Sequence, residues 1–157
     1  MSYLKAKHLS ELLVSKGLTI SVAESCTGGS LSSSLTSISG ASSYFNCGFI
    51  TYSNQSKIDM LGVNPESIEM YGAVSEKVAH EMVIGAGQRS HSNLAVSITG
   101  IAGPSGGSAS KPVGMVCIGF SFDGDVTTTT QFFKGSRSDI VSQSITYALV
   151  ELSLMLS

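Results

Sequence analysis

Hydrophobic positions recur along the chain at two spacings, one typical of helices and one typical of strands. Within 4–16, Leu9, Leu12 and Leu13 recur at helical spacing, and Lys16-Gly17 follows as a stop signal. The same reasoning predicts helices over 29–38, 56–61, a segment that begins after Ser75, and 138–156. Continuous or alternating apolar runs predict strands over 18–23, 44–53, 93–99, 116–122 and 126–133.

The order of these elements indicates the fold class. Helices and strands alternate in the first part of the chain, and the sequence Asp-Gly-Asp at 123–125 predicts a hairpin between the last two strands. Pro65 begins a turn, and Ser136 with Asp139 forms a candidate capping box for the last helix. We therefore expect a single domain over 1–157: a three-layer α/β/α architecture with a mixed, mainly parallel sheet and a late antiparallel hairpin.

Composition narrows the classes of partner. Of the 157 residues, 42% are apolar and only 13% are charged, and the formal net charge is −2. Without a basic stripe we expect no nucleic-acid partner, and without a leader or a long apolar run we expect no membrane partner. The three cysteines are an odd number without close spacing, which fits a reducing cytoplasm. The three histidines are far apart, so we expect neither a metal site nor a cofactor.

The segment "AESCTGGS" (23–30) is the first candidate site. It lies where a predicted strand turns into a helix, and such a junction presents free backbone N–H groups to an anion. Gly28 and Gly29 would let a ligand approach the backbone, although a plain turn explains them equally well. Glu24 could orient a lysine, bind a substrate hydroxyl or cap the helix.

Ser25 is a candidate nucleophile, but it needs a base. No histidine is well placed in the sequence, whereas a neutral lysine can serve as the base. Tyr52 and Lys57, in "ITYSNQSKIDMLG" (50–62), lie at the end of a predicted strand and the start of the next helix. That end of a strand is where α/β sheets carry their sites. Ordinary packing for Tyr52 and a solvated helix face for Lys57 are the alternatives.

A second candidate segment is "TGIAGPSGGSASKPVG" (99–114). It lacks the Gly-Lys-Ser/Thr ending of a phosphate-binding P-loop and matches no dinucleotide fingerprint. Its glycines at 100, 103 and 106 could offer backbone N–H groups to an anionic substrate, or the segment could be a mobile connector. Arg137 lies near a predicted helix N-terminus, where a cation is unfavourable, so an anion is expected to hold it there.

Four segments together, "AESCTGG", "GFITYSNQSK", "GAVSEKV" and "TGIAGPSGGSASKPVG", resemble the carboxyl-terminal domain family of the competence/damage-inducible protein CinA. The resemblance covers nearly the whole chain. It implies a stand-alone nicotinamide-nucleotide amidohydrolase, which converts nicotinamide mononucleotide (NMN) to nicotinate mononucleotide and ammonia in pyridine nucleotide salvage. It also implies a homo-oligomer, most simply a dimer.

The resemblance assigns roles to individual residues. It implies Ser25 as nucleophile and Tyr52 and Lys57 as its catalytic partners. The residues expected to bind substrate are Glu24, Thr27, Gly28, Gly29, Thr99, Gly100, Gly103 and Arg137. Three positions depart from the family pattern: Ser136 replaces an acid, Cys47 replaces an arginine, and Ala41 stands in a usual Gly-Ser-Ser. The change at Ser136 bears on the setting of Arg137.

Two other functions remain open from the residues. One is a thiol hydrolase that uses Cys26 in place of Ser25. The other is a nucleotide-sensing module that binds its ligand without turnover, because binding and catalytic loops look alike in sequence.

Overall fold

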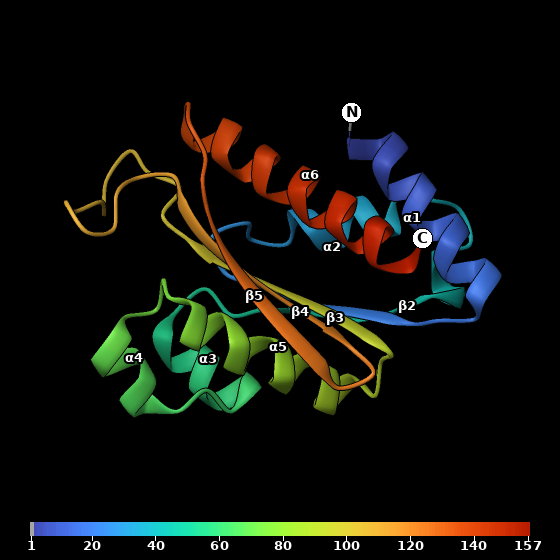
Figure 1. Cartoon of the computed structure of the whole chain (residues 1–157), viewed down its shortest axis with the longest axis horizontal. Coiled ribbons are helices and arrows are strands. Elements are labelled where there is room, and N and C mark those ends of the chain that lie inside the picture. Colours follow the sequence, from blue (N-terminus) through green and yellow to red (C-terminus); the bar gives the residue numbers. More distant parts are fainter. Residues whose placement is uncertain (1) are drawn as a thin grey trace.

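The computed structural model describes residues 2–157 and contains one five-stranded mixed sheet with helices on both faces (Figure 1). Strand β1 lies between β2 and β3 and is parallel to both, while β4 is antiparallel to β3 and to β5. The strands are β1 (Ile20–Glu24), β2 (Phe45–Ile50), β3 (Leu94–Gly100), β4 (Met115–Phe122) and β5 (Asp125–Phe132). Four of the five strands thus run in one direction, and β4 alone runs against them.

Two groups of helices cover the sheet. Helices α1 (Ser2–Lys16), α2 (Ser30–Thr36) and α6 (Arg137–Leu156) lie on one face. Helices α3 (Asn54–Leu61), α4 (Pro65–Tyr71) and α5 (Glu76–Ser90) lie on the other, and a 3₁₀ turn, η1 (Ala41–Ser43), precedes β2. This arrangement confirms the predicted three-layer α/β domain with its late hairpin.

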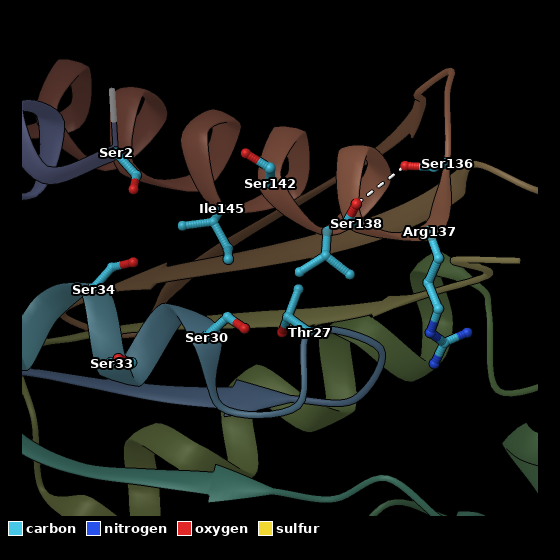
Figure 2. Close-up of a pocket in the computed structure, with 11 residues that line it drawn as sticks. Ser2, Thr27, Ser30, Ser33, Ser34, Ser136, Arg137, Ser138, Ser142 and Ile145 are labelled. Atoms are coloured by element: carbon cyan, nitrogen blue, oxygen red, sulfur yellow. Dashed lines mark hydrogen bonds between the residues drawn. The ribbon is translucent and has the colours of Figure 1, made fainter.

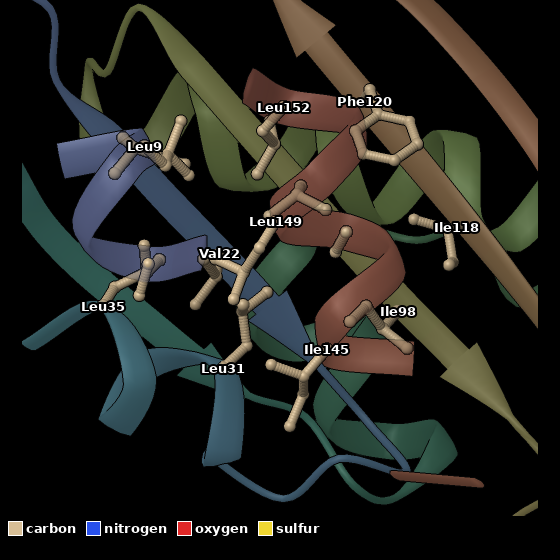
Figure 3. Packing of buried hydrophobic residues seen from close by; sticks show 14 of the residues in the cluster. Leu9, Val22, Leu31, Leu35, Ile98, Ile118, Phe120, Ile145, Leu149 and Leu152 are labelled. Carbon is tan, nitrogen blue, oxygen red and sulfur yellow. The ribbon is translucent and has the colours of Figure 1, made fainter. Parts of the chain in front are cut away.

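The larger part of the core lies between the sheet and the first group of helices (Figure 3). Leu9 of α1, Leu31 of α2 and Leu149 of α6 meet Val22 of β1 and Ile98 of β3, and all five side chains are fully buried. A smaller cluster under α5 covers the opposite face. Because β1 and β3 are covered on both faces, their near-continuous apolar sequences are those of internal strands.

The main local difference from the sequence prediction is helix α4. The sequence predicts a turn at Pro65, but the segment that begins there forms seven residues of helix. Asn64 caps the helix by accepting from the N–H of Glu66, and Pro65 occupies the first turn, where its missing N–H costs nothing. The capping box between Ser136 and Asp139 is present as predicted.

The register of the parallel strands brings three chain segments together. Glu24, the last residue of β1, pairs with Ile50 of β2 and Ile98 of β3. The residues that follow each of these positions, Ser25, Thr51 and Thr99, therefore lie at one edge of the sheet.

None of the helices in residues 2–157 has both the length and the apolar composition needed to cross a bilayer.

Candidate active site

A cavity of about 260 Å³ opens at this edge of the sheet. It is lined by the turn after β1, the start of the β2–α3 connection, the segment after α4, the loop after β3 and the first residue of α6. The lining residues named in the sequence prediction are Ser25, Cys26, Tyr52, Lys57, Thr99, Gly100, Gly103, Gly106 and Arg137. The structure thus brings residues from five separate segments to one site.

Ser25 and Lys57 form the centre of the cavity. Lys57 Nζ lies 2.9 Å from Ser25 Oγ and donates to the carbonyl oxygen of Thr51 at 2.8 Å. Lys57 is 1% exposed, and its burial lowers its pKa to about 8 because the charged form is poorly solvated there. Ser25 is 8% exposed. The pair therefore has the geometry and the electrostatics of a serine with a lysine base.

Glu24 holds the turn that carries Ser25. Its carboxylate is fully buried and accepts four hydrogen bonds, from the hydroxyl groups of Thr27 and Ser32 and from the backbone N–H groups of Leu31 and Ser32. These N–H groups belong to the first turn of α2. The Glu24 carboxylate lies outside that helix in the chain and caps its N-terminus by accepting from them. The sequence leaves three roles open for Glu24: to orient a lysine, to bind a substrate hydroxyl or to cap the helix. Its contacts in the structure are those of a helix cap.

The turn itself depends on its two glycines. Gly28 (φ 57°) and Gly29 (φ 103°) both have left-handed backbone conformations, which a side chain would disfavour. The N–H of Gly28 donates to the carbonyl of Ser25 at 3.1 Å and closes the turn. Thr27, Gly28 and Gly29 do not line the cavity; they shape the loop that presents Ser25.

Tyr52 and Arg137 form the outer rim. Both side chains are exposed, and Arg137 donates to the Tyr52 hydroxyl at 2.7 Å and to the Gly103 carbonyl at 2.6 Å. Within residues 2–157 the one ion pair joins Lys77 and Glu81, so no carboxylate accompanies Arg137. The rim therefore carries a positive charge that an anionic ligand would balance.

Arg137 also lines a second, larger hollow, an open groove of about 800 Å³ between α2 and α6 (Figure 2). Its other lining side chains are mostly hydroxyls, among them Thr27, Ser30 and Ser138. The groove holds neither Ser25 nor Lys57, so the smaller cavity is the candidate active site.

Cys26 lies beside Ser25 and lines the same cavity. Burial raises the pKa of its thiol to about 11, which leaves it protonated at neutral pH. All three cysteines are free thiols.

In the part of the chain that the structure describes, no three His, Cys, Asp or Glu side chains are grouped so that they could hold a metal ion.

The sequence prediction missed several parts of the site. Asn54, Ala73, Val74, Ile101, Ala102 and Ser105 also line the cavity. Ala73 and Val74 belong to the segment "GAVSEKV", which is part of the family resemblance but by itself indicates no chemical role. The carbonyl oxygen of Thr51, which holds Lys57, had no signal because every residue carries one.

Comparisons with known proteins show the family of the chain. The family model of the CinA C-terminal domain matches residues 3–156. The chain is 48% identical, over 87% of its length and 84% of the relative's, to a nicotinamide-nucleotide amidohydrolase PncC of Enterobacter agglomerans. It is 44% identical to the Escherichia coli K12 protein of the same name, over 94% of this chain and 90% of that one.

Other relatives are longer. The chain is 56% identical to a CinA-like protein of Chloroherpeton thalassium but covers 30% of that protein. It spans about a third of the length of several curated relatives that it matches.

Solved structures share the fold. The crystal structure of the competence/damage inducible protein CihA from Agrobacterium tumefaciens is 41% identical, with a TM-score of 0.94 over 99% of this chain and 94% of that one. A competence or damage-inducible protein from Enterobacter asburiae gives 33% identity and a TM-score of 0.97 over 100% of this chain and 99% of that one.

Proposed function

The chain belongs to the CinA C-terminal domain family, and on that premise we propose that it is a nicotinamide-nucleotide amidohydrolase with Ser25 as its nucleophile. The reaction is the hydrolysis of NMN to nicotinate mononucleotide and ammonia. The observation that carries the proposal is the 2.9 Å contact between Ser25 Oγ and a buried lysine whose pKa is about 8. The names of the two PncC relatives support the choice of substrate.

In the proposed mechanism, neutral Lys57 takes the proton of Ser25 as Oγ attacks the amide carbon. The backbone N–H group of Cys26, a residue that lines the cavity, stabilises the negative oxygen that forms. The carbon–nitrogen bond then breaks, protonated Lys57 gives its proton to the leaving nitrogen, and ammonia departs. Water then attacks the ester while Lys57 takes its proton, the bond between the carbonyl carbon and Ser25 Oγ breaks, and Lys57 returns the proton to Oγ as nicotinate mononucleotide is released.

The lowered pKa matters for the amount of active enzyme. With a pKa of about 8, roughly one Lys57 side chain in ten is neutral at pH 7. An ordinary lysine with a pKa of about 10.4 would be neutral in only about one molecule in 2,500. Burial of Lys57 thus raises the population of the catalytic base by more than two orders of magnitude at about neutral pH.

Tyr52 contributes from the rim. Its hydroxyl oxygen accepts from Arg137, so its own proton is free to be donated to bound substrate. Its carbonyl oxygen lies 3.4 Å from Lys57 Nζ, and a proton relay from the hydroxyl to Lys57 would run through substrate or water. We assign Tyr52 the donation of a proton to bound substrate.

Arg137 and the glycines of the loop after β3 are the proposed site of the substrate phosphate. Arg137→Met is expected to raise the KM for NMN by about tenfold or more, because a charge-assisted phosphate contact is lost. Nicotinamide riboside has no phosphate and should show much less change. Steady-state kinetics with both substrates tests this; an equal loss for both would place Arg137 at the reacting amide instead.

Cys26→Ala is expected to leave ammonia release within about threefold of the wild-type rate, because a thiol with a pKa near 11 supplies very little thiolate at neutral pH. The measurement is kcat for NMN at pH 7.5. A loss comparable to that of a nucleophile variant would support the thiol hydrolase.

The direct test of the proposal is ammonia release from NMN by the purified full chain, with and without a chelator. We expect turnover in both, since the proposed chemistry needs only side chains of the cavity. NMN binding by calorimetry without any ammonia would instead support the non-catalytic nucleotide-binding function. Loss of turnover on chelation, restored by a divalent cation, would contradict the mechanism.

We also propose that the protein acts as a homodimer in the cytoplasm, in pyridine nucleotide salvage. Its three free thiols suit a reducing compartment, and its low content of charged residues suits association. Light scattering on the purified chain measures the oligomeric state directly.

A further inference from the structure

The connecting segment, residues 71–74, consists of the last residue of α4 and the first three residues of the connection to α5, and side chains hold it by its backbone carbonyl oxygens. Lys111 Nζ donates to the carbonyls of Tyr71 and Val74, the latter at 2.7 Å. Thr99 Oγ1 donates to the carbonyl of Ala73, and Ser75 Oγ to that of Gly72, each at 2.9 Å. All four consecutive carbonyl groups thus accept from side chains, and Lys111 supplies two of the four donors.

Lys111 reaches this segment from the far end of the glycine-rich loop (100–114). Its backbone is fixed within the loop, where its N–H donates to Ser108 Oγ at 3.1 Å and its carbonyl accepts from the Ser108 N–H at 2.8 Å. At the other end, Gly72 has a φ of 80°, and a Cβ there would lie 2.7 Å from Lys111 Nζ. Gly72 therefore leaves the space that the ammonium group occupies.

The two segments that Lys111 joins are two walls of the active-site cavity. Ala73 and Val74 line it from the connecting segment, and Ile101 to Gly103 line it from the glycine-rich loop. No acidic side chain pairs with Lys111 within residues 2–157, so its charge is directed to backbone oxygens. Hydrogen bonds from an ammonium group are stronger than those from a neutral donor.

We propose that Lys111 is a positioning residue that clamps the connecting segment to the glycine-rich loop and so fixes the width of the substrate cavity. Thr99 completes the clamp from the end of β3. Lys111 does not line the cavity itself, so it acts on substrate through Ala73 and Val74. The effect of Lys111 on substrate binding rests on the proposed function. The joining of the two cavity walls by Lys111 rests on the contacts alone.

The test compares Lys111→Met, Lys111→Arg and a matched control, Lys7→Met, in which an exposed lysine of α1 is changed. Hydrogen–deuterium exchange is measured on the full chain. In Lys111→Met, peptides covering 71–76 and 101–114 should exchange faster by about tenfold or more, because without the two Lys111 contacts the hydrogen-bonded amides of these segments, those of Gly72 and Ser108 among them, open more often. Peptides of α1 and α6 should be unchanged. Lys111→Arg keeps donors but crowds Gly72, so it should restore part of the protection.

Kinetics give the second readout. Lys111→Met should raise the KM for NMN by about tenfold while kcat changes by less than about threefold, since the Ser25–Lys57 pair is untouched. Exchange unchanged at 71–76, or faster evenly across the whole chain, would overturn the clamp. An unchanged KM in an active enzyme would overturn its role in substrate positioning. If the wild-type chain releases no ammonia, the proposed function fails, and the exchange data still decide the clamp.

Discussion

Ser25→Ala is expected to abolish ammonia release from NMN, with a loss in kcat of about 10³-fold or more. The loss follows because Oγ is the only atom removed, and in the proposed mechanism it forms the bond to the amide carbon. The fold should survive. The Ser25 N–H still donates to the Ile98 carbonyl at 2.9 Å, and Glu24 still holds the turn from the other side. The change in melting temperature should be small.

A serine outside the cavity is the matched control. Ser37 is exposed just after α2, and its hydroxyl donates to the carbonyl of Ser34. Ser37→Ala should keep wild-type kinetics. Should Ser25→Ala retain turnover within tenfold of wild type, the nucleophile is a different group, and the double variant with Cys26→Ala becomes the decisive measurement.

The placing of Ser25, Tyr52 and Thr99 could be predicted from sequence because it depends on strand direction. Each lies just after, or at the end of, an apolar run, and the carboxyl ends of parallel strands share one edge of a sheet. These three placements need only local patterns and one topological rule. Lys57 is different, because the residues alone also allow a solvated helix face, and the pairing with Ser25 is implied by the family resemblance. In the structure α3 (Asn54–Leu61) directs Lys57 toward Ser25.

The role of Glu24 was harder to predict, because a buried carboxylate has several uses that look identical in sequence. The choice of the cap depends on the N-cap residue of α2, Gly29, which offers no side-chain oxygen. The two N–H groups at 31 and 32 then need an acceptor from elsewhere, and Glu24 is the nearest carboxylate along the chain. That inference requires the boundary of α2, which sequence patterns give only to within a few residues.

Helix α4 and the wall that follows it could not be placed from the sequence. Asn64-Pro65 is both a turn signal and a helix start, and a helix of seven residues has too few positions to show a period. The contacts of residues 71–74 are made by backbone carbonyls, which carry no residue-specific signal. Only the lysine of "SASKPVG" marks this clamp in the sequence, and its target lies 40 residues away along the chain.

Lys57→Arg is expected to lose about 10²- to 10⁴-fold in kcat, the range that general-base catalysis supplies, although the side chain stays cationic. A guanidinium remains protonated at any pH the fold withstands, so it cannot accept the proton of Ser25. Lys57→Met is the matched variant: it keeps the apolar stem and removes both base and charge. A loss of kcat in both variants indicates that Lys57 acts as a base. A loss in Lys57→Met alone would indicate that only its positive charge is needed.

The pH dependence of the wild-type enzyme is the companion measurement. With its pKa lowered to about 8 by burial, Lys57 should give a kcat that rises about tenfold per pH unit below pH 8 and levels off above it. Stability should follow the same group. The unfolded chain holds this proton up to a pKa of about 10.4, so between about pH 8 and 10.4 the unfolded state binds more protons and stability rises with pH.

Lys57→Met isolates that contribution, since the wild-type chain should gain stability relative to this variant across the window. Urea unfolding at pH 7.5 and pH 9.5 measures the difference. A pH profile of kcat that is flat between pH 6 and 9, together with near wild-type turnover in Lys57→Arg, would reduce Lys57 to a fixed positive charge. The base would then have to be sought among groups that reach Ser25 through water, and Tyr52, which also lines the cavity, is one candidate.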